Sequence, residues 1–121
     1  MNTIVSDVLD ELHEDLISHG WLVQAIMLAD QGSRPSQSRI INVLTELLET
    51  GQVEIGLTHQ AEPDYLEFVA WNGTVEGKTS RALEAVAAAN GPDKEFAYWL
   101  CLRENVDRFE GKLSENSNEG M

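Results

Sequence analysis

Basic residues are scarce in this sequence, and one long stretch of it has none. Eight Lys and Arg face 21 Asp and Glu, which gives a formal net charge of −13 at pH 7. Residues 1–77 hold 13 acids and two bases, Arg34 and Arg39, for a net of −11, whereas residues 78–121 hold 8 acids and 6 bases, for a net of −2. Such a surface repels nucleic acids and anionic membranes and speeds encounter with basic proteins. We therefore expect neither a nucleic-acid nor a membrane partner, although acidity also serves solubility alone.

Cysteine is limited to Cys101, and long apolar runs are missing. A single cysteine cannot form an internal disulfide, and no apolar run approaches the roughly 18 residues that a transmembrane helix needs. The N-terminal segment MNTIVSDVLDELHED lacks the basic start of a secretory signal, and its first acid is Asp7. These absences predict a protein of the reducing cytoplasm.

The motifs of metal, phosphate and nucleophile sites are missing too. The three histidines, His13, His19 and His59, belong to no HExxH pattern, and the chain has no CxxC pair or EF-hand loop. The segment NGTVEGKTS ends like a phosphate-binding loop but lacks its glycine spacing. Cys101 lies in an apolar segment, where a buried thiol is usually unreactive. The sequence thus predicts no catalytic residue, no metal and no cofactor, in a protein that is not an enzyme.

What the sequence does contain is helical periodicity in its first part. A helix over Ile4–Ile17 is predicted by apolar residues that recur with helical spacing, namely Ile4, Val5, Val8, Leu9, Leu12 and Leu16. Its opposite face carries Asp7, Asp10, Glu11 and Glu14. Gly20 suits the C-terminal stop of this helix, with His19 near the negative end of the dipole. The segment Trp21–Asp30 predicts a second, mostly buried helix.

A third helix is predicted from Ser36, which can cap it, to about Thr50, where Gly51 suits a left-handed stop. The polar residues of its outer face are Gln37, Ser38, Arg39, Asn42, Thr45, Glu46 and Glu49. Reading DNA from this face would require basic flanks for the phosphates, and the two glutamates would oppose the backbone charge. The composition of this helix therefore disfavours a DNA-reading role.

A hairpin is predicted after the third helix. Apolar and polar residues alternate in QVEIGLTH, residues 52–59; the segment Gln60–Asp64 turns the chain, and Tyr65–Trp71 is the returning strand. If Leu66, Phe68 and Ala70 face inward, then Tyr65, Glu67, Val69 and Trp71 face outward. That outward set has the composition of an interface anchor, although packing under a later helix is the alternative. Three helices followed by a hairpin is the winged-helix order.

The remaining chain predicts one more helix and one ambiguous segment. Lys78–Asn90 predicts an Ala-rich helix. In Phe96–Arg103 the aromatic residues favour a third strand, while the apolar spacing also fits a helix; we favour the strand, followed by a short helical turn near Val106–Phe109. The result is a single α+β, winged-helix-like domain over residues 1–109, with a disordered tail over residues 110–121.

The segments DVLDELHEDL, GWLVQAIMLA, SRIINVLTELLETGQVEIG and YLEFVAW, in this order and spacing, resemble small acidic bacterial winged-helix-like proteins. That group includes immunity proteins of contact-dependent growth inhibition and other polymorphic toxin systems. The resemblance spans about residues 4–103 and implies a protein without catalytic residues that binds a toxin. The chain departs from DNA-binding relatives in its lack of basic residues.

The sequence therefore predicts a cytoplasmic immunity or antitoxin protein that neutralises a basic toxin domain, which we expect to be a nuclease. An acidic surface can occupy the basic cleft that holds the nuclease substrate, and opposite charges speed capture. The expected partner-binding residues are Asp7, Asp10, Glu11, Glu14, Glu46, Glu49, Glu54, Glu62, Asp64, Glu67, Tyr65 and Trp71. The alternatives are a transcriptional regulator that reads DNA through Asn42 and Arg39, and an acidic adaptor between proteins. Both a monomer and a homodimer are compatible with the sequence.

Overall fold

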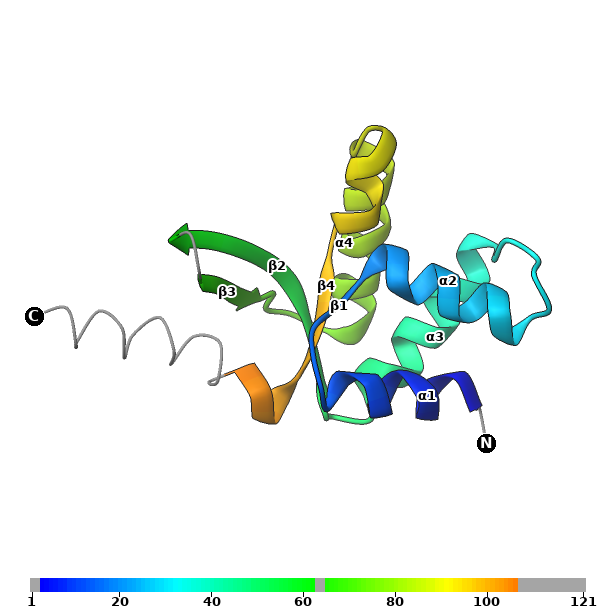
Figure 1. Cartoon of the computed structure of the whole chain (residues 1–121), viewed down its shortest axis with the longest axis horizontal. Helices are drawn as coiled ribbons and strands as arrows, with labels where there is room; N and C mark the ends of the chain where they lie inside the picture. The colour runs from blue at the N-terminus through cyan, green and yellow to red at the C-terminus, as the bar shows by residue number, and fades with distance from the viewer. Residues whose placement is uncertain (1–2, 63–64, 107–121) are drawn as a thin grey trace, which may run out of the picture.

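A computed structural model describes residues 3–62 and 65–106 as an α+β arrangement of four α-helices, one 3₁₀ helix and a four-stranded antiparallel sheet (Figure 1). The elements in chain order are α1 (Thr3–Leu12), β1 (Ile17–Ser18), α2 (His19–Ala29), α3 (Gln37–Glu49), β2 (Val53–Glu62), β3 (Tyr65–Ala70), α4 (Val75–Ala88), the 3₁₀ helix η1 (Gly91–Phe96) and β4 (Trp99–Leu102). The predicted α+β class is confirmed. No helix in these ranges combines the length and hydropathy required to cross a bilayer.

The first helix is shorter than its apolar spacing predicts. Helix α1 ends at Leu12, and Ile17–Ser18 form strand β1, so the predicted extent to Ile17 is wrong. The turn after α1 closes with a hydrogen bond from the Glu14 backbone N–H to the Glu11 carbonyl, 2.9 Å long. Ile17 is buried by pairing with Leu100 of β4 rather than by a further helical turn. A buried apolar residue at this position is compatible with a further helical turn or with a strand. Pairing with the distant strand β4 determines that Ile17 belongs to a strand.

The predicted roles of His19 and Gly20 at the end of the first helix are also wrong. Helix α2 begins at His19, and the Ser18 hydroxyl caps it by accepting a hydrogen bond from the Trp21 backbone N–H at 3.3 Å. Gly20 lies inside α2, where a Cβ atom would stand 2.9 Å from the Cβ of Glu95. The glycine therefore permits close packing of α2 against η1, rather than a helix stop.

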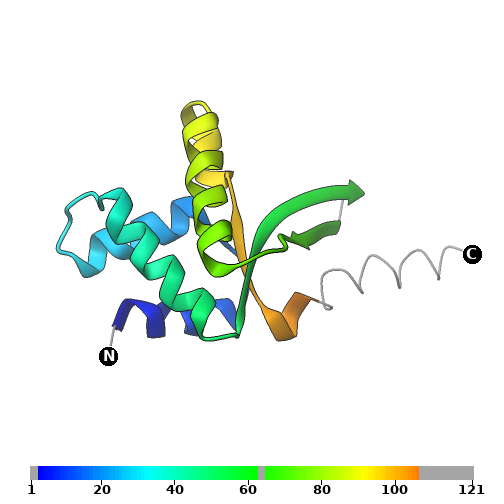
Figure 2. The same cartoon turned by 180° about the vertical axis from the view of Figure 1, so that it is seen from behind.

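Helix α3 and the two strands of the following hairpin are confirmed, but strand β2 runs to Glu62, so the predicted turn over Gln60–Asp64 is wrong at residues 60–62. Ser36 caps α3 by accepting a hydrogen bond from the Arg39 backbone N–H at 3.1 Å, and Gly51 has the positive φ of 77° that its position requires. Strands β2 and β3 pair antiparallel from Gly56↔Ala70 to Glu62↔Tyr65. Figures 1 and 2 show this hairpin projecting from the helical body, on the side away from the α2–α3 connection.

The ambiguous segment after α4 is a strand, as favoured, and the helical alternative is wrong over Trp99–Leu102. Strand β4 lies between β1 and β2 in the sheet order β1-β4-β2-β3. Leu100 therefore pairs with Ile17 on one side and with Ile55 on the other. Residues 103–106 are helical. The rest of the predicted turn, residues 107–109, and the tail over residues 110–121 lie outside the described residues.

One core joins the helices to one face of the sheet. It contains Ile4, Val8 and Leu12 of α1, Leu22 and Ile26 of α2, Val43, Leu44 and Leu47 of α3, Ala82 of α4, and Ile17, Val53, Ile55, Leu100 and Leu102 of the sheet. Helix α4 begins at Val75, before the predicted Lys78, because Thr74 caps it by accepting a hydrogen bond from the Gly77 backbone N–H at 3.0 Å. The helices and the sheet of the described residues therefore share one core.

Candidate functional site

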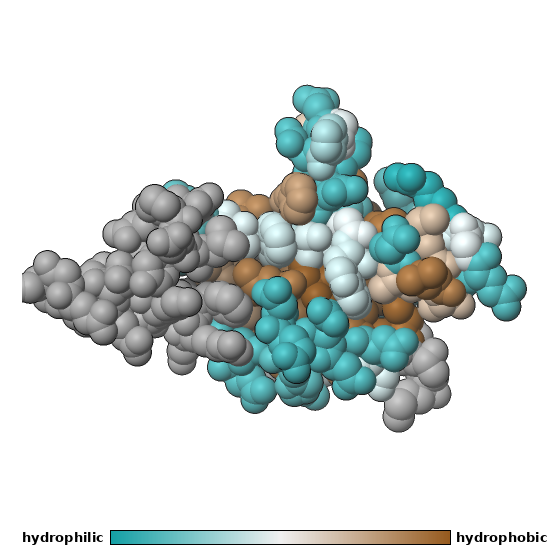
Figure 3. Space-filling view, in the orientation of Figure 1, coloured by the Kyte–Doolittle hydropathy of each residue, from teal (hydrophilic) through white to brown (hydrophobic). Residues whose placement is uncertain are grey.

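The acidic face predicted on the first helix is solvent-exposed. Asp7, Asp10 and Glu14 are exposed and Glu11 is half-buried, because the opposite face of α1 packs into the core. Figure 3 shows hydrophilic residues gathered along the lower edge of the molecule, over α1. Within the described residues, no Lys, Arg or His forms an ion pair with any of these four carboxylates. Within the described part of the chain, this face therefore carries several negative charges that no ion pair compensates.

A second pair of predicted carboxylates lies on α3, which packs against α1. Glu46 and Glu49 are both exposed. Arg39, on the same helix, turns toward α2, where its Nε and Nη2 atoms each donate a hydrogen bond of 3.0 Å to the carboxylate of Asp30. These hydrogen bonds hold the pKa of Asp30 below its usual range. The outer face of α3 thus presents carboxylates, while its one guanidinium is already engaged.

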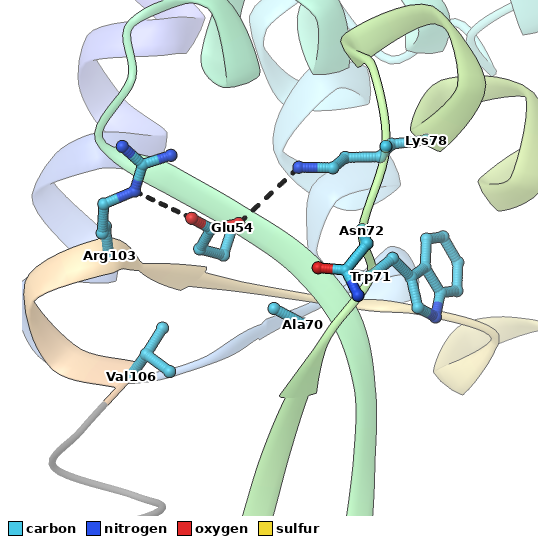
Figure 4. Close-up of a pocket in the computed structure, with 8 residues that line it drawn as sticks. Glu54, Ala70, Trp71, Asn72, Lys78, Arg103 and Val106 are labelled. Carbon is cyan, nitrogen blue, oxygen red and sulfur yellow. Dashed lines mark hydrogen bonds and ion pairs between the residues drawn. The ribbon is translucent and has the colours of Figure 1, made fainter.

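Glu54 is predicted to bind a partner, and in the structure its carboxylate already pairs with two cations of the same chain. Its carboxylate accepts a hydrogen bond of 2.8 Å from Arg103 Nε, and it lies 3.8 Å from Lys78 Nζ (Figure 4). Only 16% of the side chain is exposed. Strand alternation points Glu54 away from the helical core, but it does not reveal that α4 and the segment after β4 bring two cations to it. Glu54 is therefore neutralised within the molecule.

The Glu54 cluster borders an open pocket of about 490 Å³. Asn72, Gly73 and Val106 complete its rim, and Figure 4 shows the Trp71 ring directed away from Glu54. Lys78 and Arg103 share the one carboxylate of Glu54, so this cluster of three side chains carries a formal net charge of +1. The ion-pair cluster is best understood as a structural link between β2, α4 and the segment after β4.

Trp71 was predicted as an outward interface anchor and is instead buried, with 6% of its surface exposed. The Arg81 guanidinium of α4 lies 4.4 Å from the centre of its ring, so packing under the later helix, the alternative reading, is correct. The Trp71 backbone N–H donates a hydrogen bond of 2.8 Å to the Ile55 carbonyl, which places Trp71 on the core face of the sheet. Buried Phe68 lies on the opposite face.

The core face of the sheet becomes exposed where the hairpin extends beyond the helices. Leu57 and Val69, directly opposite each other, are 43% and 46% exposed, although they share this face with Ile55 and Trp71. Val69 is predicted to face outward, whereas the alternation of residues 52–59 places Leu57 on the same, apolar side of the strand as Val53 and Ile55. Glu67 is half-buried opposite His59. The alternation of apolar and polar residues indicates on which face of the sheet a side chain lies. Whether that side chain is exposed depends on how far the helices extend over the sheet.

Three predicted wing residues are not tested. Asp64 and the side chains of Glu62 and Tyr65 lie outside the described part of the chain. Among the residues that are described, no three His, Cys, Asp or Glu side chains gather closely enough to hold a metal ion. Cys101 is buried, as expected from its apolar segment. Comparisons with protein-family models, with curated proteins and with solved structures found no match.

Proposed function

We propose that this chain is a cytoplasmic, non-enzymatic binding protein of the immunity or antitoxin kind, which captures a basic toxin domain through its acidic surface. The contact surface consists of the acids of α1 (Asp7, Asp10 and Glu11), Glu14 in the turn after α1, and Glu46 and Glu49 of α3. The observation that carries the proposal is the absence of any compensating cation next to the α1 carboxylates in the described residues. Such a field attracts a cation-rich protein and excludes polyanions.

The location of the cations supports this proposal. Within residues 3–62 and 65–106, most of them have an intramolecular role: Arg39 pairs with Asp30, Lys78 and Arg103 pair with Glu54, Arg81 covers Trp71, and Lys94 donates to the Val86 carbonyl. The positive charges are thus used to join elements, while the negative charges of α1 and α3 face solvent. A basic nuclease domain would meet this surface as it meets its own anionic substrate.

We propose that the scaffold is winged-helix-like. The order α1, β1, α2, α3 and then the β2–β3 hairpin supports this assignment, with β4 as an addition between β1 and β2. In this proposal the hairpin is the wing, and its exposed Leu57 and Val69 supply an apolar contact beside the acidic faces. The regulator alternative is weakened because Arg39 would have to leave Asp30 to reach a phosphate.

The proposal is tested with the protein encoded immediately upstream of this chain, co-expressed and co-purified with it. We expect a complex whose dissociation constant rises with salt, and whose affinity falls about tenfold or more, or about 1.4 kcal/mol, in Glu46→Lys/Glu49→Lys. Asp7→Lys/Asp10→Lys should act in the same direction. The matched control is Glu76→Lys/Glu84→Lys, two exposed acids of α4, which should retain affinity.

Three results would reject the proposal. Binding that is unchanged by salt and by both α1 and α3 reversals would exclude the electrostatic surface. Specific retention of a duplex DNA in a gel-shift series at ordinary ionic strength would favour the regulator through Asn42 and Arg39 instead. A complex that forms without protecting cells from the partner would indicate an adaptor.

A further inference from the structure

A groove lies where α2, the start of α3, α4 and η1 meet, on elements other than the acidic face of α1. It comprises two connected hollows of about 330 Å³ and 160 Å³. Both are lined by His19, Val23, Arg34 and Val86, so they form one continuous site, called here the His19 groove. The larger hollow alone reaches the lower size range of pockets that hold small molecules.

The charged side chains of the His19 groove are two cations, Arg34 and Lys94, and one carboxylate, Glu95, beside the neutral amides of Gln24 and Gln37. This local excess of positive charge lies in a molecule whose net charge is −13. Arg34 and Lys94 line it together with His19, and Glu95 is an exposed carboxylate at its edge. Lys94 Nζ donates one hydrogen bond, of 2.8 Å, to the Val86 carbonyl, which leaves two of its three hydrogens for a ligand. Neither Arg34 nor Lys94 forms an ion pair with a carboxylate of the described residues.

His19 is fixed at the floor of the groove. Its Nδ1 atom shares a hydrogen bond of 2.8 Å with the Tyr98 hydroxyl, and the two rings meet edge to face at 5.0 Å between centres. This leaves Nε2 as the ring nitrogen without an assigned partner in the described residues. Burial, and then the charges of Arg34 and Lys94, lower the pKa of His19. Arg34 and Lys94 line the same hollow as the imidazole of His19.

The rest of the lining is apolar. Val23 and Met27 come from α2, and Val86 from α4. In the smaller hollow, Ile40 and Leu83 continue this apolar wall. An apolar wall with a few converging polar groups is the usual composition of a small-molecule site.

We propose that the His19 groove binds a small organic monoanion, a carboxylate attached to a short apolar body. The carboxylate contacts Arg34, which offers paired N–H donors, and Lys94, beside the imidazole of His19. The apolar body packs against Val23, Met27 and Val86. A single carboxylate suits the site better than a polyphosphate, because the strongly acidic chain around it repels ligands of high negative charge.

This site is independent of the proposed toxin-binding surface, which uses other residues. Reversal of Glu46 and Glu49 should leave ligand binding at the groove unchanged, and neutralisation of Arg34 should leave toxin binding unchanged. The two proposals can therefore fail separately.

The test is titration of the full chain with hexanoate, monitored by amide chemical shifts and by calorimetry. We expect saturable shifts confined to residues 19–27, 34–40, 83–86 and 94–95. Hexanol and hexylammonium, which keep the apolar body but lose or reverse the charge, should bind at least tenfold more weakly. Inorganic phosphate, which has the charge without the apolar body, should also bind at least tenfold more weakly.

Variants distinguish the loss of the cationic contacts to the ligand from a loss of the folded structure. Arg34→Gln changes an exposed loop residue and should weaken hexanoate binding about tenfold with an unchanged melting temperature. Lys94→Gln should weaken it similarly, and Lys94→Arg should restore it. Arg81→Gln, which removes a cation elsewhere on the molecule, is the matched control and should have no effect. Equal binding of hexanoate and hexanol, equal binding of phosphate, unchanged binding in Arg34→Gln, or no saturable shift would each overturn the proposal.

Discussion

Gly56 of β2 lies where the two strands of the hairpin come unusually close. A Cβ atom at this position would stand 2.0 Å from the Val69 carbonyl oxygen and 2.8 Å from its carbon, both backbone atoms that cannot rotate away. We predict that Gly56→Ala lowers the free energy of unfolding by about 3 kcal/mol, the upper end of overpacking costs, because β2 and β3 must separate. Urea denaturation monitored by circular dichroism measures the loss.

The matched control for Gly56→Ala is Thr58→Ala, on the same strand and the same face. It removes atoms without creating a collision and should cost less than about 1 kcal/mol. Equal losses in the two variants would show that the cost belongs to the strand in general rather than to the close approach at Gly56.

His19 gives the molecule a pH-dependent stability of defined sign. Its pKa is lowered from 6.5 in the folded chain, so the unfolded chain binds a proton more readily. The stability that neutral His19 contributes is therefore fully present above about pH 6.5 and is lost as the pH falls through the folded pKa. We predict that His19→Gln reduces the slope of unfolding free energy against pH between about pH 7.5 and 5.5.

Urea denaturation at several pH values checks the His19 prediction. The variant His59→Gln, at an exposed histidine of β2, controls for the removal of an imidazole. The same slope in wild type and in His19→Gln would contradict the assignment. Tyr98 should not contribute to this window, because burial raises the pKa of its hydroxyl far above it.

Single residues were predictable from the sequence where only local spacing mattered. The exposure of Asp7 and Asp10 and the burial of Phe68 follow from periods of the helix and the strand. The outward position predicted for Trp71 was wrong, and the ion pairs of Glu54 were not predicted, because both environments come from distant parts of the chain, namely Arg81, Lys78 and Arg103. No local pattern contains that information.

At the scale of elements, the bounds of α3 were predicted, whereas the starts of α2 and α4 and the end of α1 were not. Ser36 and Gly51 bound α3 as predicted, because capping is chemistry between near neighbours. The end of α1 and the existence of β1 were missed. A strand as short as β1 is stabilised by pairing with β4, which follows about 80 residues later in the chain. The local spacing of residues 4–17 contains no information on that distant partner. The assignment of β4 itself succeeded through aromatic and apolar composition.

The cap of α3 offers a direct test at this scale. The Ser36 hydroxyl accepts the hydrogen bond from the Arg39 backbone N–H, and the first turn of α3 has no acidic residue to replace it. We predict that Ser36→Ala lowers the free energy of unfolding by about 1 kcal/mol, the usual cost of a lost cap. Thermal and urea denaturation should agree on this value.

Ser38→Ala is the control, since Ser38 is exposed within the same helix and Ala is the better helix former. It should leave stability unchanged or slightly raised. If Ser38→Ala lowered the free energy of unfolding as much as Ser36→Ala, the loss could not be attributed to the capping hydrogen bond of Ser36.

For the whole molecule, charge was the property that sequence alone described best, and sheet order the one it described least. The uneven distribution of acids predicts an exposed negative face, and α1 and α3 carry one. The order β1-β4-β2-β3 inserts the last strand between two earlier ones, so the sheet is complete only when residues 99–102 arrive. Pairing between strands distant in sequence depends on contacts that no single segment specifies.

This sheet order predicts that the molecule unfolds as one unit, with Leu100 at its centre. Leu100 is fully buried and pairs with Ile17 and with Ile55, so it joins the N-terminal strand to the hairpin. We predict that Leu100→Ala costs about 2–5 kcal/mol. Leu57→Ala, at a leucine that is 43% exposed on the hairpin, should cost less than about 1 kcal/mol.

Tryptophan fluorescence and far-ultraviolet circular dichroism should give one coincident transition in both variants, because Trp21, Trp71 and Trp99 report from α2, the end of β3 and β4. Separate transitions, with the helices outlasting the sheet in Leu100→Ala, would show that β4 closes a sheet that the helical core does not require.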